Sequence, residues 1–335
     1  MSSLYKIARG MSLGVPEIGE TFYVVDTNFR TSAQGWTQSD RTGPLDLYAE
    51  KNPGRVFYGA GGGTYSPSNS YATDVLAIQA AVDAAVDFRG DVLAFSPGSF
   101  SLATAVALNV PGLRVLGPVV GHPKRSLVTV TDAIGDGYTI SVDDVEIAYH
   151  TLIPITALNQ ISVASGADRG YLHHLYWNVA GIATSTSTQF CSATTAVDWL
   201  MENCSFYIDD EQGDVGTLTS CQRWVIQDND FYVGLTGVAW ESVFTFLTSA
   251  LGMVARRNMF RGCGGATPAL FTNIFTGVAN VNGQLMAYQN YIDGTALATA
   301  SAIETTFGTA TDIELADNYQ TGDATGEGGV VIALA

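Results

Sequence analysis

Acidic side chains are densest at Asp209-Asp210-Glu211, and Asp214 follows shortly afterwards. Carboxylates of this kind can act as the acid and base of glycoside hydrolysis, or they can bind calcium. Adjacent side chains of a β-strand point to opposite faces, so Asp209 and Asp210 would not meet on an extended segment. We therefore expect a solvated acidic loop and predict no catalytic residue, with Asp209, Asp210 and Glu211 as the alternative catalytic set.

Two histidines, His173 and His174, are adjacent, whereas His122 and His150 stand alone. On a regular strand the side chains of His173 and His174 diverge, so they should not hold one metal ion. Positions in the core and at a corner are expected for this pair. No GxSxG motif occurs and no Ser-His-Asp set can be argued. We also predict no bound metal ion and no cofactor.

Two further pairs of charged residues could do chemistry. Asp143-Asp144 precedes the strand-like VEIAYHTL and is expected to form a turn. Arg256 and Arg257 stand directly before Asn258 and could hold an anion, although arginine on a protein exterior is ordinary.

The cysteines have no CxxC spacing. We interpret them as small buried apolar residues, with a disulfide or a metal site as the alternatives. They are Cys191, Cys204, Cys221 and Cys263.

The elements that must position these side chains repeat along the chain. Short apolar runs, such as the one in VIQDNDFYV, end in a charged or polar residue and then an asparagine. Units of this kind recur every 25 to 32 residues, which is typical of a solenoid. The asparagines are Asn203, Asn229, Asn258, Asn290 and Asn318, with Asn178 as a weaker member.

Three short strands and three turns account for about 27 residues per coil, and each strand would pair with its equivalent on the next coil. The positions five and three residues before the asparagine are apolar and are predicted to point inward. These pairs are Trp224/Ile226, Met253/Ala255, Leu285/Ala287 and Ile313/Leu315. The Asn203 unit departs from the pattern because Asp198 holds the first of these places, which predicts a bulge or a shift by one residue.

Asparagine is disfavoured in strands but tolerates left-handed backbone, so each asparagine is expected at a sharp corner. Stacked amides can also bond to one another as a ladder. A row of ligand-binding asparagines is the functional alternative.

One helix is predicted, capped by Thr73 or Asp74 and ended by Gly90. Its single apolar face suits a helix that covers one open end of the solenoid. That face consists of Ile78, Ala81, Val82, Ala85 and Val86.

The run YATDVLAIQAAVDAAVDFRGDVLAFSPGSFSLATAVALNVPGLRVLGP, residues 71–118, resembles the opening of pectate-lyase-like right-handed β-helix proteins. These often begin with a TDDTAAIQAAIDAA helix, followed by a GGTVYFPPGTY strand and a GLRIIG strand. The matching residues are Thr73, Asp74, Ala77, Ile78, Gln79, Ala80, Ala81, Asp83, Ala84, Ala85, Pro97, Gly98, Gly112, Leu113 and Gly117.

The continuation GPVVGHPKRSLVTVTDAIGDGYTISVDDVEIAYHTL more narrowly resembles β-helix structural proteins encoded by tailed phages. In those proteins a GLGRGNKRP turn is followed by ISASDVTIENL. His122, Pro123, Lys124 and Arg125 fall at that turn.

Residues 55–335 are therefore expected to form an all-β, right-handed parallel β-helix of about ten coils with one short N-terminal capping helix. Residues 1–54 lack the repeat and are expected to be an N-terminal arm or attachment segment. An ordered cap on the main domain is the alternative for these residues.

The chain of 335 residues has 32 acidic and 15 basic residues, a formal charge of −17. Such an acidic surface repels nucleic acid and anionic lipid, so neither is an expected partner. There is no run of about 18 apolar residues, and no apolar segment follows Lys6 and Arg9, so neither a membrane span nor a secretion signal is expected.

The resemblance implies a virion structural protein of a tailed phage without enzymatic activity, either a capsid decoration or cement protein or a fibre-like component. It would assemble in the host cytoplasm as a homotrimer and join the major capsid protein or another virion protein through residues 1–54. The alternative is a tailspike that binds or depolymerises a host surface polysaccharide, and the third possibility is a cellular polysaccharide lyase or glycoside hydrolase. Tryptophans that could stack on sugars, or lie in the core, are Trp36, Trp177, Trp199 and Trp240.

Overall fold

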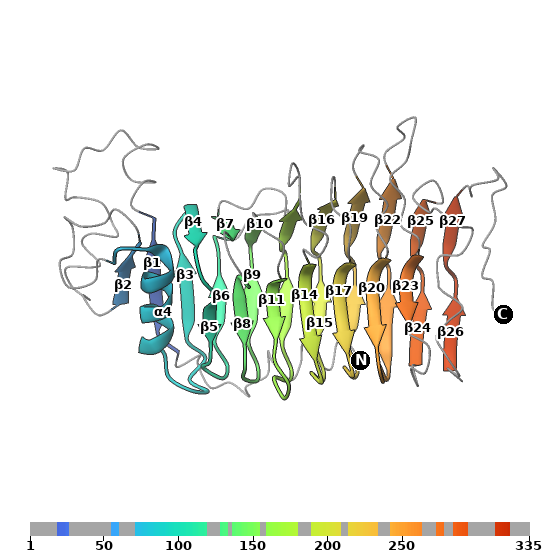
Figure 1. Cartoon of the computed structure of the whole chain (residues 1–335), viewed down its shortest axis with the longest axis horizontal. Helices are drawn as coiled ribbons and strands as arrows, with labels where there is room; N and C mark the ends of the chain where they lie inside the picture. The colour runs from blue at the N-terminus through green and yellow to red at the C-terminus, as the bar shows by residue number, and fades with distance from the viewer. Residues whose placement is uncertain are drawn as a thin grey trace.

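A computed structural model of the chain shows an elongated solenoid of parallel β-strands, with one helix beside its N-terminal end (Figure 1). The structure describes residues 19–26, 55–59, 71–118, 128–132, 136–154, 159–179, 189–208, 214–233, 242–262, 273–277, 284–293 and 312–321. The predicted fold class, an all-β parallel β-solenoid with one short helix, is confirmed.

Three parallel sheets, here called A, B and C, run along the solenoid. In spatial order, sheet A contains β2 (Val56–Tyr58), β1 (Thr21–Val25), β3 (Val92–Phe95), β6 (Arg114–Leu116), β9 (Glu146–Ala148), β12 (Tyr171–His173), β15 (Leu200–Glu202), β18 (Val225–Gln227), β21 (Met253–Arg256), β24 (Gln284–Tyr288) and β26 (Asp312–Ala316). Sheet B contains β4 (Gly98–Leu102), β7 (Val128–Asp132), β10 (His150–Pro154), β13 (Tyr176–Asn178), β16 (Ser205–Ile208), β19 (Asp230–Val233), β22 (Met259–Gly262), β25 (Tyr291–Asp293) and β27 (Tyr319–Thr321). Sheet C contains β5 (Val106–Leu108), β8 (Tyr138–Ile140), β11 (Asn159–Val163), β14 (Gln189–Thr194), β17 (Asp214–Thr219), β20 (Ser242–Leu247) and β23 (Asn273–Gly277).

The chain passes through sheets A, B and C once per turn, so strands three apart in the sequence are neighbours in a sheet. Because sheet C has 7 strands in the described residues, 7 turns have a strand in all three sheets. That is fewer than the ten coils expected from the length of the chain. Two later turns contribute strands to sheets A and B only.

Alternate residues of each strand point inward and form stacks along the axis. In sheet B the rings of Phe206, Phe231 and Phe260 stack with centroids 4.5 and 4.8 Å apart. Sheet A adds Trp199 on Trp224 at 5.3 Å. The predicted inward pairs Trp224/Ile226, Met253/Ala255 and Leu285/Ala287 are buried, and the side chains of Ile313 and Leu315 lie outside the described ones.

The helix α4 (Asp74–Ala84) packs against β1, β2, β4 and β5 at the N-terminal end. Thr73 caps it, because its Oγ1 accepts a hydrogen bond from Leu76 N at 3.3 Å. The expected end at Gly90 was wrong: Ala85 is already extended and forms the C-cap. Val86 is 49% exposed and not part of the buried face, because its backbone N–H is held by the Asp91 carboxylate at 2.8 Å.

The buried face of α4 is otherwise as predicted. Ile78, Ala81 and Val82 are buried, and Ala85 is partly buried against the core.

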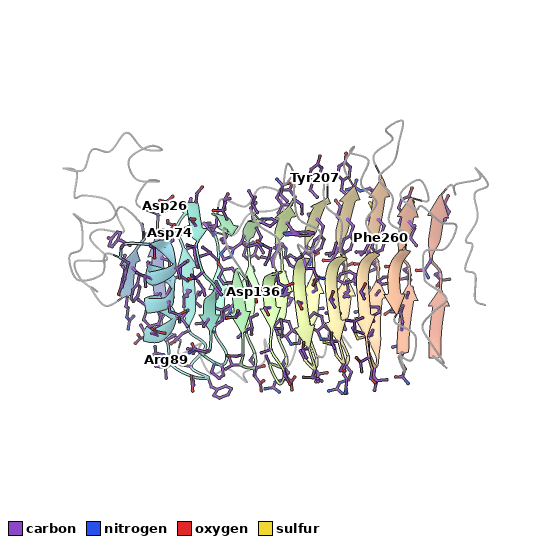
Figure 2. The ribbon with its side chains drawn as sticks, in the orientation of Figure 1. Asp26, Asp74, Arg89, Asp136, Tyr207 and Phe260 are labelled. Atoms are coloured by element: carbon purple, nitrogen blue, oxygen red, sulfur yellow. The ribbon has the colours of Figure 1, made fainter. Side chains whose placement is uncertain are left out.

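Buried aspartates fasten this end of the solenoid. Asp26 and Asp74 lie beside the helix in Figure 2, and their carboxylates accept backbone N–H bonds from Ser99 at 2.9 Å and Ser101 at 2.7 Å. Strand β1, which belongs to the segment 1–54 expected to be an arm, pairs with β3 of sheet A. The boundary at residue 54 therefore does not separate β1 from the solenoid.

A left-handed residue turns the chain at the corner between sheets A and B. In the later turns these residues are Asp228 (φ 56°), Arg257 (φ 51°), Gln289 (φ 56°) and Asp317 (φ 54°). Each directly precedes a ladder asparagine, and Asn229, Asn258 and Asn290 do not themselves have positive φ. For the ladder asparagines the left-handed conformation is therefore not observed, because the preceding residue makes the turn and the amide is directed between turns.

The predicted asparagine ladder is present. Oδ1 of Asn258 accepts hydrogen bonds from both the backbone N and Nδ2 of Asn229 at 3.1 Å. Asn290 bonds Asn258 in the same way at 3.0 Å, and Asn318 bonds Asn290 at 3.0 and 2.9 Å. Each Nδ2 also donates to a backbone carbonyl on sheet A, so the buried amides are saturated.

Two asparagines that were expected in the ladder lie elsewhere. The pairing of Glu202 with Gln227 puts Asn203 level with Asp228, and Asn203 itself is left-handed with a φ of 54°. Cys204 therefore occupies the ladder position, which confirms the predicted shift by one residue.

Asn178 is also not a ladder member. It lies on β13, paired with Tyr207, while Leu175 holds the corner position of that turn.

Candidate functional site

The predicted acidic set is only partly within the described residues. Asp209, Asp210 and Glu211 lie outside them, so the alternative catalytic assignment remains a prediction. Asp214 begins β17 and pairs with Ser242 of sheet C.

Asp143 and Asp144 form the expected turn, in which Asp144 is left-handed with a φ of 63°. Both carboxylates bind the guanidinium of Arg169 on the next turn, with Nη2 at 2.5 Å from Asp143 Oδ2 and 3.1 Å from Asp144 Oδ2. The hydrogen bond that Arg169 donates to Asp144 contributes most to raising the pKa of Arg169 above its ordinary value. These aspartates therefore fasten successive turns to each other.

The same device recurs at other corners. Arg223 pairs with Asp198 at 2.6 Å and Arg257 with Asp228 at 2.7 Å, each across adjacent turns. Arg261 of sheet B also binds Asp230. Arg257 was expected to be able to hold an anion, and in the structure it binds the carboxylate of Asp228 from the same chain.

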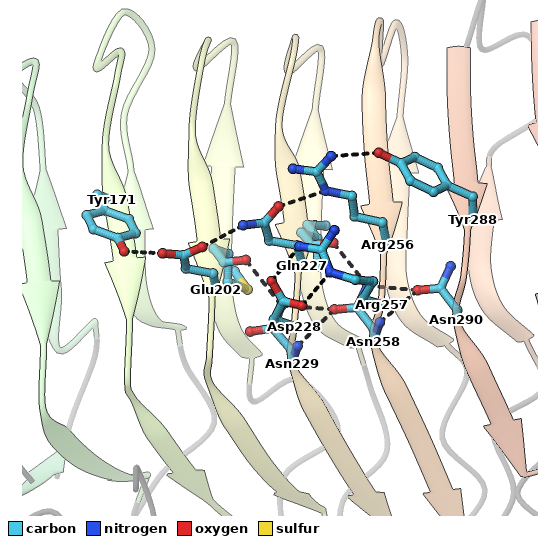
Figure 3. A network of polar contacts seen from close by, with 12 residues as sticks. Tyr171, Glu202, Gln227, Asp228, Asn229, Arg256, Arg257, Asn258, Tyr288 and Asn290 are labelled. Carbon is cyan, nitrogen blue, oxygen red and sulfur yellow. Dashed lines mark hydrogen bonds and ion pairs between the residues drawn. The ribbon is translucent and has the colours of Figure 1, made fainter. Parts of the chain in front are cut away.

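A row of polar side chains crosses five turns on the outer face of sheet A (Figure 3). Tyr171 Oη donates to Glu202 Oε1, and Gln227 Nε2 donates to Glu202 Oε2 at 2.5 Å. Arg256 then donates through Nε to Gln227 Oε1 at 2.8 Å and through Nη1 to Tyr288 Oη at 2.7 Å. We call these five residues the sheet A polar row.

The sheet A polar row is deeply buried in its middle. Glu202 and Gln227 are 1% and 2% exposed, and both oxygens of the Glu202 carboxylate have donors. Burial and the hydrogen bond to Glu202 raise the pKa of Tyr171 above its ordinary value, so this phenol stays protonated. A buried carboxylate held by two neutral donors is a structural link between turns in this conformation.

Counting from the asparagines hides this row, because Asn178 and Asn203 do not hold the ladder position. Counted from the corner position of each turn, the residue two places earlier is His173, Glu202, Gln227, Arg256 or Tyr288 in successive turns. Aligning the units on Cys204 instead of Asn203 would have shown this column of polar residues.

A second cluster adjoins the row on its N-terminal side. Glu146 Oε2 accepts from Arg114 Nε at 3.0 Å, and Glu146 Oε1 lies 2.9 Å from His173 Nε2. Burial alone would raise the pKa of Glu146, but the His173 hydrogen bond and the Arg114 charge outweigh it and lower that pKa to about 2. Glu146 is thus an anion over the ordinary pH range and orients the imidazole of His173.

His173 is buried and His174 lies at the corner, as predicted, but their side chains do not diverge. His173 ends β12, but His174 is left-handed with a φ of 52°, so the pair does not follow strand geometry. The rings converge, with His173 Nδ1 and His174 Nδ1 2.8 Å apart. His150 is fully buried beside Phe95 and Tyr138, and His122 lies outside the described residues.

Cys191, Cys204 and Cys221 are free and buried, as the interpretation as small apolar residues requires. Burial raises the pKa of Cys204 and of Cys221 to about 12, which makes these thiols poor nucleophiles. Within the described ranges, no group of three or more His, Cys, Asp or Glu side chains is arranged to hold a metal ion. Cys263 lies outside them.

The described tryptophans face the interior. Trp177 and Trp199 are 0% and 1% exposed, so neither is available to stack on a sugar. Trp36 and Trp240 lie outside the described residues. No helix within the described residues is long and apolar enough to cross a membrane.

Comparisons with known proteins give a likeness of fold. No protein-family model matches the chain, and no curated protein matches it in sequence. Among solved structures, the A-module of the mannuronan C-5 epimerase AlgE6 from Azotobacter vinelandii is 13% identical, with a TM-score of 0.49, over 73% of this chain and 71% of that one. A pectate lyase variant from Xanthomonas campestris is 12% identical, with a TM-score of 0.41, over 73% and 76%.

A protein of Geobacillus virus E2 is 11% identical, with a TM-score of 0.25, over 81% of this chain and 74% of that one. The solenoid of the present chain follows from its own strand pairing, and these likenesses concern the fold alone.

Proposed function

We propose that this chain is a non-enzymatic structural protein of a tailed-phage particle, a capsid decoration or cement protein or a fibre-like component. It assembles in the host cytoplasm as a homotrimer. Residues 1–54 join it to the major capsid protein or another virion protein.

The observation that carries the proposal is that the buried polar side chains bond neighbouring turns of the solenoid to each other. The described carboxylates that could do chemistry are bound to the neighbouring turn: Glu202 by Tyr171 and Gln227, and Glu146 by Arg114 and His173. A catalytic carboxylate has to present an oxygen to substrate in a concave site. Here the carboxylates join turns, as expected of a protein whose task is to be a rigid rod.

Two features of the sequence support a place on a phage particle. The stretch around His122 resembles β-helix structural proteins of tailed phages, and a charge of −17 keeps the rod off nucleic acid. Neither feature requires a catalytic site.

The test is to locate the protein and to look for activity. Imaging of purified particles labelled on this chain should place it on the capsid or a fibre, and sedimentation of the purified chain should give a trimer. Deletion of residues 1–18, which precede β1, should leave the trimer folded but abolish joining to particles lacking the protein. A truncated chain that still decorates such particles contradicts attachment through this segment, and a monomer contradicts the trimer.

A second candidate, a tailspike that binds a surface polysaccharide, is favoured by one observation. Tyr207 and Tyr232 stack at 5.3 Å on the outer face of sheet B, alternating with buried phenylalanines. Further along, Tyr291 and Tyr319 stack at 5.6 Å, and Tyr319 is 59% exposed. Outward aromatic rings suit the apolar faces of sugars.

The two candidates differ in a simple assay. If the chain is a tailspike, the protein should bind host-cell polysaccharide, and Tyr319→Ala should weaken this binding. Any release of sugar ends should be lost in Asp209→Ala. The structural protein predicts no sugar release from wild type or variant. Release that depends on Asp209 would replace the first proposal with the second.

A further inference from the structure

The corner after β12 brings two histidine side chains together that a regular strand would separate. His174 has a φ of 52°, a conformation that histidine visits more readily than most residues. This turn directs its ring back toward His173, and the two ring centroids are 5.0 Å apart at 84°. Their Nδ1 atoms lie 2.8 Å apart.

The proton positions at this pair follow from the neighbours. Nε2 of His173 lies 2.9 Å from Oε1 of Glu146, and because a carboxylate oxygen accepts, Nε2 carries the proton and donates it. The Nδ1 of His173 then presents a lone pair when the ring is neutral. In the metal-free chain, Nδ1–H of His174 donates to that lone pair and closes the gap.

The same geometry fits a metal ion. Metal–nitrogen bonds of about 2.05 Å at a right angle put two nitrogens about 2.9 Å apart, whereas a tetrahedral angle puts them about 3.3 Å apart. The hydrogen-bonded separation of 2.8 Å is thus closer to the spacing required by a square-planar or tetragonal ion, the geometry of Cu²⁺ and Ni²⁺, than to that of a tetrahedral one.

The surroundings of His173 are those of a supported ligand. Metal-binding histidines commonly donate their other ring N–H to a carboxylate, which fixes the ring and raises its basicity. Glu146 does this here, while Tyr171 stacks on the His173 ring at 4.0 Å. His173 is 7% exposed, and His174, half-buried at the corner, lies on the solvent side of the pair.

We propose that His173 and His174 bind one divalent ion of tetragonal preference, Cu²⁺ or Ni²⁺, through their Nδ1 atoms. Solvent or an external ligand completes the coordination. When Nδ1 of His174 binds the ion, the proton that it carried moves by way of solvent to Nε2 of the same ring, so two neutral rings release no net proton. Glu146 is a positioning residue, because it orients His173 and does not touch the ion.

The test is a titration of the full-length, metal-stripped chain with Cu²⁺ at pH 7, followed by calorimetry and by the electron paramagnetic resonance spectrum. Wild type should bind one equivalent more Cu²⁺ than His174→Asn, with two nitrogen ligands in the spectrum of that ion. Asparagine tolerates left-handed backbone, so this variant should keep the fold, which circular dichroism will check.

Two further variants sharpen the result. Asn203→Gly changes the same corner position one turn later without removing a histidine, so its titration should match wild type. Glu146→Gln keeps both ligands but loses the anion behind His173, so Cu²⁺ affinity should fall on the order of tenfold or more while two nitrogens remain in the spectrum. Equal Cu²⁺ binding by wild type and His174→Asn, or a spectrum without two nitrogen ligands, overturns the proposal.

Discussion

The corner between sheets A and B is built in two ways along the same solenoid. In the earlier turns the position after the left-handed residue is held by His150, Leu175 and Cys204, and in the later turns by the asparagine ladder. The backbone bend is similar in both regions, with left-handed Tyr149 and His174 in the earlier turns and Asp228 in the later ones.

The bend itself therefore does not require asparagine. The difference lies in how the buried corner is filled. Leu175 and Cys204 fill it with apolar volume, whereas each ladder amide satisfies a backbone N–H of the preceding turn and is itself saturated. His150 fills the corner with a polar ring that makes no such bond. Within the described chain neither of its ring nitrogens has a hydrogen-bond partner.

The largest effect on stability is expected when the same substitution to glycine is made at two asparagines, one in the ladder and one at a corner. Asn258→Gly removes the acceptor of Asn229 N and Nδ2 and leaves Ile226 O without its donor, so it should lower the free energy of unfolding by about 4 kcal/mol. Asn203→Gly, at a left-handed and half-buried position, should change it by less than about 0.5 kcal/mol. Urea unfolding measures both, and equal losses would contradict the distinction between ladder and corner.

Acid should weaken the earlier turns first. Burial lowers the pKa of His150 to about 3, so its contribution to stability is complete above the ordinary value of 6.5 and is lost as the pH falls toward 3. Between pH 7.5 and 4.5 this loss should be about 2–3 kcal/mol. His150→Leu, which copies Leu175 one turn on, should remove that part of the pH dependence, as followed by urea unfolding at both pH values.

If wild type and His150→Leu lose the same stability between these two pH values, His150 is not the group responsible. Glu146 acts at lower pH, because its pKa of about 2 lies below the ordinary 4.5 and its contribution is lost only as the pH falls through that window.

Two of the earlier turns meet in a tight contact that a methyl group can probe. A Cβ on Gly170 would lie 2.1 Å from the nearest ring atom of Trp199, which is itself stacked on Trp224. Gly170→Ala should therefore cost about 1–3 kcal/mol and reduce the protection of Trp199 Nε1–H, which is bonded to Ala167 O at 2.7 Å, against hydrogen exchange. Gly166→Ala meets nothing within 4 Å and has a φ of 81°, so it measures the backbone strain alone.

The smallest effect is expected from the exposed corner ion pairs. Arg223 and Asp198 are 57% and 38% exposed in their side chains, so Asp198→Asn should lower stability by less than about 1 kcal/mol. The difference from wild type should shrink further in 0.5 M salt, as measured by thermal unfolding. A loss as large as that of Asn258→Gly would mean that the ion pairs, not the ladder, fasten the turns.

Local patterns in the sequence were enough to predict the solenoid, its inward residues and the ladder at Asn229, Asn258, Asn290 and Asn318. Those features depend on strand alternation and on a repeat that places like residues over each other, and both can be read along a single chain. The shift by one residue at Asn203 was also predictable, because Asp198 breaks the apolar pattern there, but the residue that takes the ladder position, Cys204, was not.

Tertiary structure decided which residue bends the chain, which turns share hydrogen bonds and which side chains converge. The left-handed conformation of His174 reverses the expectation that His173 and His174 diverge, and the register of sheet A assembles the row from Tyr171 to Tyr288. The physical reason is that a corner conformation and a register are selected by the turns above and below. Residues about 25 to 32 positions apart in the sequence must therefore be in place before either is defined.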